Sequence, residues 1–123
     1  MRVPMILTLA VLALARPALA DPKLDKALTG KVAGKPVDCI SLPRVRSSTT
    51  FTKPDSILYR VGRVSYLNQP AGGCGFRMDP IIVSRTPTTQ LCRGDIISVV
   101  DRGSRIPMGS CGLGSFTPYT AAK

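Results

Sequence analysis

The stretch "RVRSSTTFTKPDSILYRVGRVSYLN", Arg44–Asn68, decides the fold class. Its first part is rich in β-branched residues, and "KPDS" (53–56) is typical of a turn because Pro directly precedes Asp. The next run alternates in the manner of a strand with two different faces. One face carries Ile57, Tyr59 and Val61, and the other carries Leu58 and Arg60. Beyond Gly62 the alternation resumes with Val64 and Tyr66 on one face, which predicts a hairpin about Gly62.

The rest of the chain continues this pattern of short strands. We expect a short strand at Ile81–Ser84 and the most apolar strand at Ile96–Val100, with the glycine-rich loop Asn68–Gly75 ahead of them. Five or six short strands with frequent Gly and Pro predict a mainly β protein. The expected architecture is a small disulfide-stapled antiparallel sheet or partly open barrel with a short N-terminal helix.

The first twenty residues have the composition of a secretory signal peptide. A basic start precedes an apolar run at Met5–Ala15, and Ala18-Leu19-Ala20 places small residues ahead of Asp21. This run is too short to span a bilayer, which takes roughly 20 apolar residues. We therefore predict cleavage after Ala20, export to the periplasm or outside the cell, and no transmembrane segment.

Residues 21–36 are predicted to form a helix and a linker. Asp21 is a suitable N-cap ahead of Pro22, and an apolar face at Leu24, Ala27 and Leu28 follows. The stretch "GKVAGKP" (30–36) is typical of a linker. A single β-rich domain is therefore expected over residues 37–123.

The charge of the predicted mature chain favours anionic partners. Without Arg2 and Arg16, 15 basic residues remain against 7 acidic ones, which gives a net charge of +8. Outside the cytoplasm such a charge favours anionic envelope polymers and lipid head groups. Nucleic acid is not an expected partner, because the basic residues are spread along the chain and no basic–aromatic motif links them.

Two absences restrict the chemistry, since the chain contains neither His nor Glu. Schemes that use imidazole as a base are excluded, and so are the common His-containing metal sites. Scattered aspartates and a Ser-Lys arrangement are the remaining acid–base candidates. We therefore predict no catalytic residue, no cofactor and no metal, and a protein that is not an enzyme.

The four cysteines, Cys39, Cys74, Cys92 and Cys111, are predicted to form two disulfides, because an even number in an exported chain is typical of structural bridges. Their wide spacing argues against a redox Cys-x-x-Cys site and against zinc. Three connectivities are compatible with the sequence. We favour Cys74 with Cys92, and Cys39 with Cys111, which would tie the start of the domain to its end.

Between two cysteines lies Arg93-Gly94-Asp95, the tripeptide found in adhesion ligands. It leads directly into the strand predicted at 96–100, whereas a ligand needs a displayed loop. We interpret Gly94 as the residue that allows the bend after Cys92. Arg93 and Asp95 are expected to be solvated charges.

The glycine-rich stretch Asp101–Phe116 carries a candidate anion contact at Arg102 and Arg105. Backbone N–H groups of such a loop can cradle a phosphate. The stretch matches neither the P-loop nor the dinucleotide fingerprint. Turn geometry around Cys111 is the favoured explanation for its glycines.

Several blocks of the sequence occur in a recognisable order: "VDCISLPRVRS", "ILYR", "SYLNQPAGGCG", "QLCRGDIISVVD" and "CGLGSFTPY". Together they cover Val37–Tyr119 and resemble a family of small exported bacterial proteins of unknown function with four cysteines. The resemblance implies a periplasmic or secreted location and paired cysteines. It implies no catalytic or binding residue.

The leading functional hypothesis is a non-enzymatic periplasmic binding or envelope-associated module. Its partners would be anionic envelope polymers, lipid head groups or a periplasmic protein. One alternative is a small secreted enzyme inhibitor that inserts a loop such as Thr86–Leu91, because a rigid loop loses less entropy on binding. Another is an enzyme that uses Asp or Ser-Lys chemistry.

Overall fold

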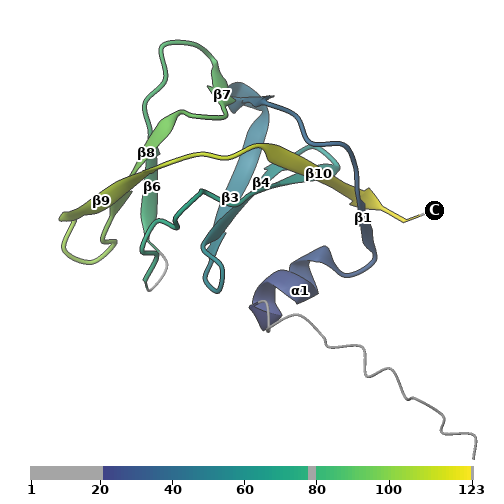
Figure 1. Cartoon of the computed structure of the whole chain (residues 1–123), viewed down its shortest axis with the longest axis horizontal. Helices are drawn as coiled ribbons and strands as arrows, with labels where there is room; N and C mark the ends of the chain where they lie inside the picture. The colour runs from purple at the N-terminus through teal and green to yellow at the C-terminus, as the bar shows by residue number, and fades with distance from the viewer. Residues whose placement is uncertain (1–20, 78–79, 123) are drawn as a thin grey trace, which may run out of the picture.

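The computed structural model describes residues 21–77 and 80–122, so the predicted signal peptide lies outside the described residues. The chain is mainly β with one short N-terminal α-helix in this part of the chain, which confirms the predicted fold class. Its strand pairings are antiparallel, and over the described residues the sheets do not close into a barrel. Figure 1 shows the arrangement.

Within the described residues the strands form three sheets. A five-stranded sheet has the order β1-β10-β5-β4-β3, a three-stranded sheet has the order β6-β8-β9, and β2 pairs with β7. In chain order the elements are α1 (Pro22–Leu28), β1 (Lys31–Ala33), β2 (Cys39–Ser41), the 3-10 turn η1 (Leu42–Arg44), β3 (Val45–Phe51), β4 (Ser56–Val61), β5 (Val64–Asn68), β6 (Ile81–Ser84), β7 (Gln90–Cys92), β8 (Ile96–Val100), β9 (Pro107–Gly112) and β10 (Phe116–Ala121).

The predicted alternation places its two sets of side chains in two different hydrophobic clusters. Ile57 and Tyr59 of β4 lie in the central core, where the Tyr59 and Phe116 ring centroids are 5.8 Å apart. Leu58, between them in sequence, packs in a second cluster on the other face of the sheet. The predicted turn at 53–56 and the hairpin at Gly62 are confirmed by the pairing of β3 with β4 and of β4 with β5.

Helix α1 covers the second face of the five-stranded sheet. The Asp21 carboxylate accepts a hydrogen bond from the Lys23 N–H at 2.9 Å, which confirms the predicted N-cap. Leu24 is 3% exposed and packs in the cluster of Phe51 and Leu67. Burying a leucine side chain in this way stabilises the fold by about 2 kcal/mol, which explains how so short a helix persists.

The predicted linker 30–36 contains a strand. Lys31–Ala33 forms β1, which pairs with β10 at one edge of the five-stranded sheet. Three residues are too few for an alternating pattern to be visible in the sequence. The helix packs against the five-stranded sheet, and β1 belongs to that sheet.

The C-terminal third of the chain connects the sheets. β9 and β10 follow one another across the molecule, from the three-stranded sheet to the five-stranded sheet (Figure 1). Leu113 and Phe116, at this crossing, are buried in the central core. The stretch predicted as a glycine-rich turn therefore contains a strand, and its turn is confined to residues before Pro107.

The predicted disulfide pairing is wrong. The bridges join Cys39 to Cys92, with Cα atoms 4.0 Å apart, and Cys74 to Cys111, with Cα atoms 5.3 Å apart. Cys39 lies directly opposite Cys92 in the β2–β7 register. Hydrogen bonds between the flanking residues leave these two cysteines at a non-hydrogen-bonded position, where side chains approach most closely. Strand register decides the connectivity, and separation along the chain does not reveal register.

Candidate functional site

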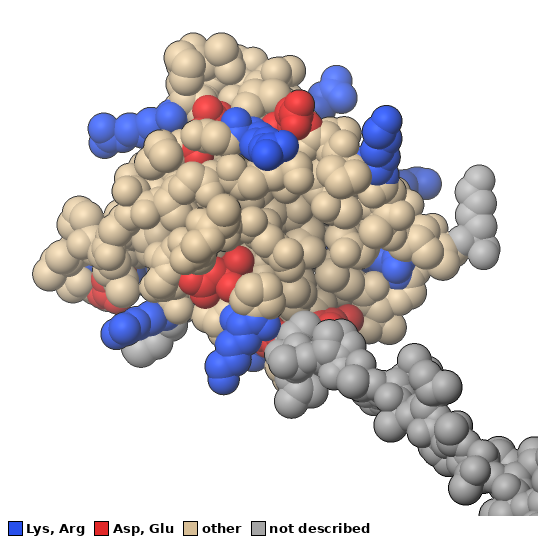
Figure 2. Space-filling model, viewed as in Figure 1, with Lys and Arg blue, Asp and Glu red and all other residues tan. Residues whose placement is uncertain are grey.

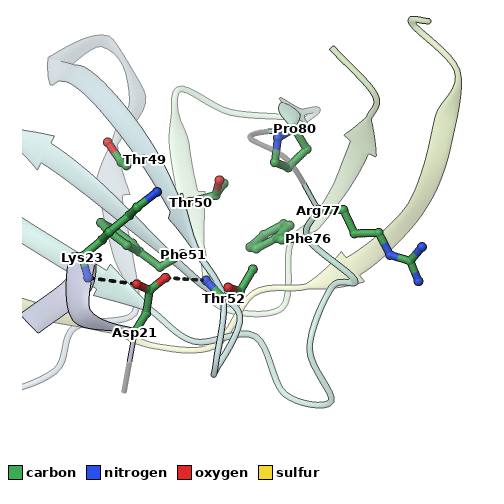
Figure 3. Close-up of a pocket in the computed structure, with 9 residues that line it drawn as sticks. All are labelled: Asp21, Lys23, Thr49, Thr50, Phe51, Thr52, Phe76, Arg77 and Pro80. Atoms are coloured by element: carbon green, nitrogen blue, oxygen red, sulfur yellow. Dashed lines mark hydrogen bonds between the residues drawn. The ribbon is translucent and has the colours of Figure 1, made fainter. Parts of the chain in front are cut away.

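A hollow among the described residues lies beside strand β3, at the outer edge of the five-stranded sheet. Its volume is about 510 Å³. Thr49–Thr52 form one wall, and Phe76, Arg77 and Pro80 lie across from them (Figure 3). Asp21 and Lys23, at the start of α1, complete the lining.

A second hollow of about 250 Å³ continues the first along the same strand. It is lined by Ser48, Thr50, Pro80–Ile82 and Arg102. Because Thr50 and Pro80 line both hollows, the two hollows are adjacent, and we call them together the β3 groove. The groove lies between β3, an edge strand of the five-stranded sheet, and β6, an edge strand of the three-stranded sheet.

Both strands that flank the groove are edge strands. β3 pairs with β4, and β6 pairs with β8, and neither has a second partner strand within residues 21–77 and 80–122. The Thr52 N–H, just beyond β3, points away from β4 and donates to the Asp21 carboxylate at 3.3 Å. Backbone groups of an antiparallel strand alternate between its two edges. By this alternation, the N–H and C=O groups of Thr50 and Ser48 point into the groove.

One end of the groove is fixed by the start of α1. The Asp21 carboxylate bonds the N–H groups of Lys23 and Thr52, and the Asp21 N–H donates to the Lys53 carbonyl at 3.2 Å. These bonds attach the helix to the end of β3. They also place Lys23 at the mouth of the groove, with its side chain extended toward β3 (Figure 3).

The opposite wall is fixed by a carboxylate and a disulfide. One oxygen of Asp55 accepts hydrogen bonds from the N–H groups of Cys74 and Gly75, both at 2.8 Å, and of Phe76 at 3.4 Å. Cys74 is also bonded to Cys111 in β9. Phe76, only 5% exposed, therefore stands on a rigid segment beside Thr50.

The described lining of the groove carries more basic than acidic side chains. Lys23, Arg77 and Arg102 are basic, and the single acidic residue, Asp21, is engaged in the two backbone bonds given above. The Arg77 side chain extends to the outer rim, away from β3 (Figure 3). Elsewhere on the face drawn in Figure 2, Lys and Arg are spread around the outline and do not gather in one patch.

The predicted anion contacts, Arg102 and Arg105, both lie in the β8–β9 turn, but they differ in their position relative to the β3 groove. Arg102 lines the β3 groove, whereas Arg105 is not among the lining residues. The Ser104 N–H donates to the Asp101 carboxylate at 2.7 Å, and the Arg105 N–H donates to the Asp101 carbonyl at 2.9 Å. The bonds from Ser104 hold the pKa of Asp101 below its usual value. The N–H groups of Ser104 and Arg105 thus bond within the turn and are not directed at a phosphate.

The aspartates of the described chain serve mainly to hold backbone in place. Asp21, Asp55, Asp95 and Asp101 each accept a hydrogen bond from at least one main-chain N–H group. No group of three or more potential metal ligands occurs within residues 21–77 and 80–122.

The Arg-Gly-Asp tripeptide closes a turn. Gly94 has φ +88°, in the left-handed region that favours glycine, as its predicted role in the bend requires. The Asp95 carboxylate accepts the Cys92 N–H at 2.7 Å, and the Gly94 N–H donates to the Leu113 carbonyl at 2.9 Å. Asp95 was expected to be a solvated charge. It is instead partly buried and bonded back to the turn, because Cys92 directs its N–H away from β2.

Sequence reasoning missed the β3 groove, although one signal was present. The run "SSTT" (47–50) lacks the apolar alternation of β4 and β5, as is typical of a strand that is not buried between two others. Phe76 and Pro80 carry no such signal, because only the fold brings them opposite β3.

Searches against protein-family models, curated proteins and solved structures found no match to this chain. The resemblance to a family of exported bacterial proteins therefore stays a prediction. Among the described residues, no helix is long and apolar enough to cross a membrane.

Proposed function

We propose that the protein is an exported, non-enzymatic binding module that holds an anionic partner in the β3 groove. The groove itself is the observation that carries this proposal. It combines an open strand edge, a buried aromatic ring at Phe76 and basic side chains at its mouth and rim. Binding sites commonly pair an apolar surface with a few placed polar groups in this way.

Export is supported by the cysteines and by the N-terminal sequence. All four cysteines are in disulfides, which form and persist mainly in oxidising compartments. A signal peptide cleaved after Ala20 would deliver the chain to the periplasm or to the exterior. The net charge of +8 that remains would draw the protein toward anionic envelope polymers, lipid head groups and acidic segments of envelope proteins.

Binding is favoured over catalysis by the use the chain makes of its carboxylates. General acid–base chemistry needs a titrating group that faces the substrate. At the groove, the lining carboxylate of Asp21 caps α1, and the Asp55 carboxylate behind the opposite wall holds the segment 74–76. Lys23 and Arg77 remain to contact a partner, and they are suited to attracting an anion.

A second candidate function is enzyme inhibition by the loop between β6 and β7. The loop projects at one end of the molecule and is largely exposed (Figure 1). Its threonines hydrogen-bond within it, from the Thr86 hydroxyl to the Thr88 carbonyl and from the Thr88 hydroxyl to the Gln90 carbonyl. The Cys39–Cys92 bridge fixes its end. Leu91 would not be inserted, because it is fully buried in the core.

Co-sedimentation with isolated cell envelope, at low and at physiological salt, tests the leading proposal. The variant Lys23→Gln/Arg77→Gln removes two charges at the groove, and Lys35→Gln/Arg93→Gln removes two charges away from it. We expect wild-type and control proteins to bind at physiological salt and the groove variant to lose most of its binding. Equal losses from both variants would mean diffuse charge attraction, which salt screens, and would refute the groove as the site.

Inhibition is tested separately with a panel of periplasmic hydrolases. If the loop is the functional element, deleting Pro87 and Thr88 abolishes inhibition while the groove variant retains it. Failure of the wild-type protein to inhibit any member of the panel would remove this second candidate.

A further inference from the structure

We propose that the partner in the β3 groove is an extended acidic polypeptide segment that adds to β3 as a further strand. This inference rests on the proposed function and specifies the ligand of the same site. The segment would come from another protein and would bind by main-chain hydrogen bonds, as in other cases of strand addition to a sheet edge.

The β3 edge lacks most of the features that protect natural sheet edges from pairing. Such edges are usually very short, covered, charged, bulged or broken by proline. β3 has seven residues, its bulge lies at one end between Val45 and Ser47, and its single charged residue is Arg46. The run from Ser47 to Thr50 has none of these features. It therefore offers the outward-facing N–H and C=O groups of Ser48 and Thr50 to an incoming strand.

A second strand edge faces the same space. Ile81 and Ile82 of β6 line the far part of the groove, and β6 is paired only with β8 in the described chain. A strand seated in the groove would lie between β3 and β6, and would connect the five-stranded and three-stranded sheets. Among the described residues β3 and β6 belong to different sheets and do not pair with each other, which leaves this space between them.

The side chains around the groove indicate the composition of the guest strand. Its residues would point alternately to the two faces of the sheet. On one face, Phe76 and the partly buried Ile82 belong to the central core, and would accept small apolar side chains. Near the mouth and rim, Lys23 and Arg77 would attract carboxylates. A segment that alternates apolar and acidic residues satisfies both faces.

A flat anionic surface or a second copy of this chain fits the site less well. Membrane binding by charge relies on clustered basic residues, and on the one face that Figure 2 draws the Lys and Arg side chains form no such cluster. A second copy would bring the basic groove residues near their own counterparts, and like charges across a strand pair are destabilising. An acidic peptide meets neither obstacle.

The test measures binding of fluorescent capped peptides to the oxidised protein. The probe is a peptide of seven residues, the length of β3, that alternates Glu and Val. A matched peptide carries N-methyl groups on alternate residues along one edge, and a second matched peptide carries them along the other. These peptides have the same charge, but N-methylation removes the hydrogen bonds that strand addition requires.

We expect saturable binding of the unmodified probe and at least about tenfold weaker binding of an N-methylated form, because several hydrogen bonds of about 1 kcal/mol each are lost. Thr50→Pro, which removes one N–H group from the open edge of β3, should weaken binding about fivefold, the equivalent of about 1 kcal/mol. Ala33→Pro on β1 is the matched control and should leave binding unchanged, because by the β1–β10 register its N–H also points away from the neighbouring strand. Circular dichroism checks that both variants fold. If either variant fails to fold, the peptide comparison still tests strand addition, because it uses only wild-type protein.

Equal affinity for all three peptides, with loss in Lys23→Gln/Arg77→Gln, would overturn strand addition and leave an anion-binding groove. Concentration-dependent dimerisation abolished by Thr50→Pro would also overturn it, in favour of a second copy. If the peptides, anionic vesicles and isolated cell wall all bind the groove variant as well as the wild-type protein, the proposed function fails as well.

Discussion

The two edges of the five-stranded sheet differ in a way that bears on function. The edge at β1 is three residues long, and the Lys31 ammonium donates to the Ser65 hydroxyl across β10 at 3.1 Å. The edge at β3 is seven residues long and opens onto a groove. Short, lysine-bearing edges are a common protection against unwanted pairing. The β1 edge is thus limited mainly by its shortness, whereas the longer β3 edge opens onto the groove.

The largest expected effect comes from the disulfide behind the β3 groove. Cys74→Ser/Cys111→Ser and Cys39→Ser/Cys92→Ser open loops of similar sequence separation, 37 and 53, so each should lower the free energy of unfolding by about 2–5 kcal/mol. Only the first loosens the wall that carries Phe76. Urea denaturation measures the stability, and peptide titration at a temperature where both variants fold should show selective loss in the first. Retained affinity in that variant would contradict the role assigned to this wall.

Helix α1 is the second place at which to test the comparison, because its N-cap residue Asp21 is bonded to the end of β3 and the helix is followed in the chain by β1. Leu24→Ala should lower the free energy of unfolding by about 2–4 kcal/mol, since it leaves a cavity beside Phe51 and Leu67. Lys26→Ala, on the exposed face of the same helix, is the matched control and should change stability by less than about 0.5 kcal/mol. Thermal unfolding monitored by circular dichroism measures both. Similar values for the two variants would show that the helix does not contribute through Leu24.

Asp55 should have a smaller and more local effect. Asp55→Ala leaves the N–H groups of Cys74, Gly75 and Phe76 without their acceptor, and we expect a loss of about 1–3 kcal/mol. Asp25→Ala, an exposed aspartate in the helix, is the control. Hydrogen exchange should show faster exchange of the amides at 74–76 in the first variant alone. Unchanged exchange there would argue that the disulfide is sufficient to hold this wall.

The smallest effect is expected at Tyr59, in β4, the interior strand that pairs with the β3 edge. Its hydroxyl is buried without a hydrogen-bond partner in the described part of the chain, so Tyr59→Phe should leave stability unchanged or raise it by about 1 kcal/mol. Burial raises the pKa of Tyr59 above its usual value of 10.0. The neutral form is therefore favoured by folding, and the stability it contributes is present below pH 10 and is lost as pH rises above it.

Denaturant titrations of wild-type protein and Tyr59→Phe between about pH 8 and pH 11 check this prediction. The wild-type protein should lose stability more steeply above pH 10 than the variant does. A clear loss of stability in the variant at neutral pH would instead indicate that the hydroxyl has a buried partner such as water.

Most of the strand content could be predicted from local pattern. The alternation from Ile57 to Tyr66 and the cap at Asp21 are effects of neighbouring residues, so the sequence displays them directly. β1, β2, β7, β9 and β10 were missed for a common reason. They are short, or interrupted by Gly and Pro, and their stability depends on strands that are distant in the chain.

The sequence by itself determined the class of the fold, the absence of imidazole-based chemistry and the presence of two disulfides. These follow from residue types and from short-range periodicity. Only the tertiary structure decided which cysteines pair and which strand edge stays open. Cys39 meets Cys92 through the β2–β7 register, and Phe76 meets Thr50 across a groove between two sheets. Such contacts join residues far apart in the chain, and they are set by how the strands pack around a shared core.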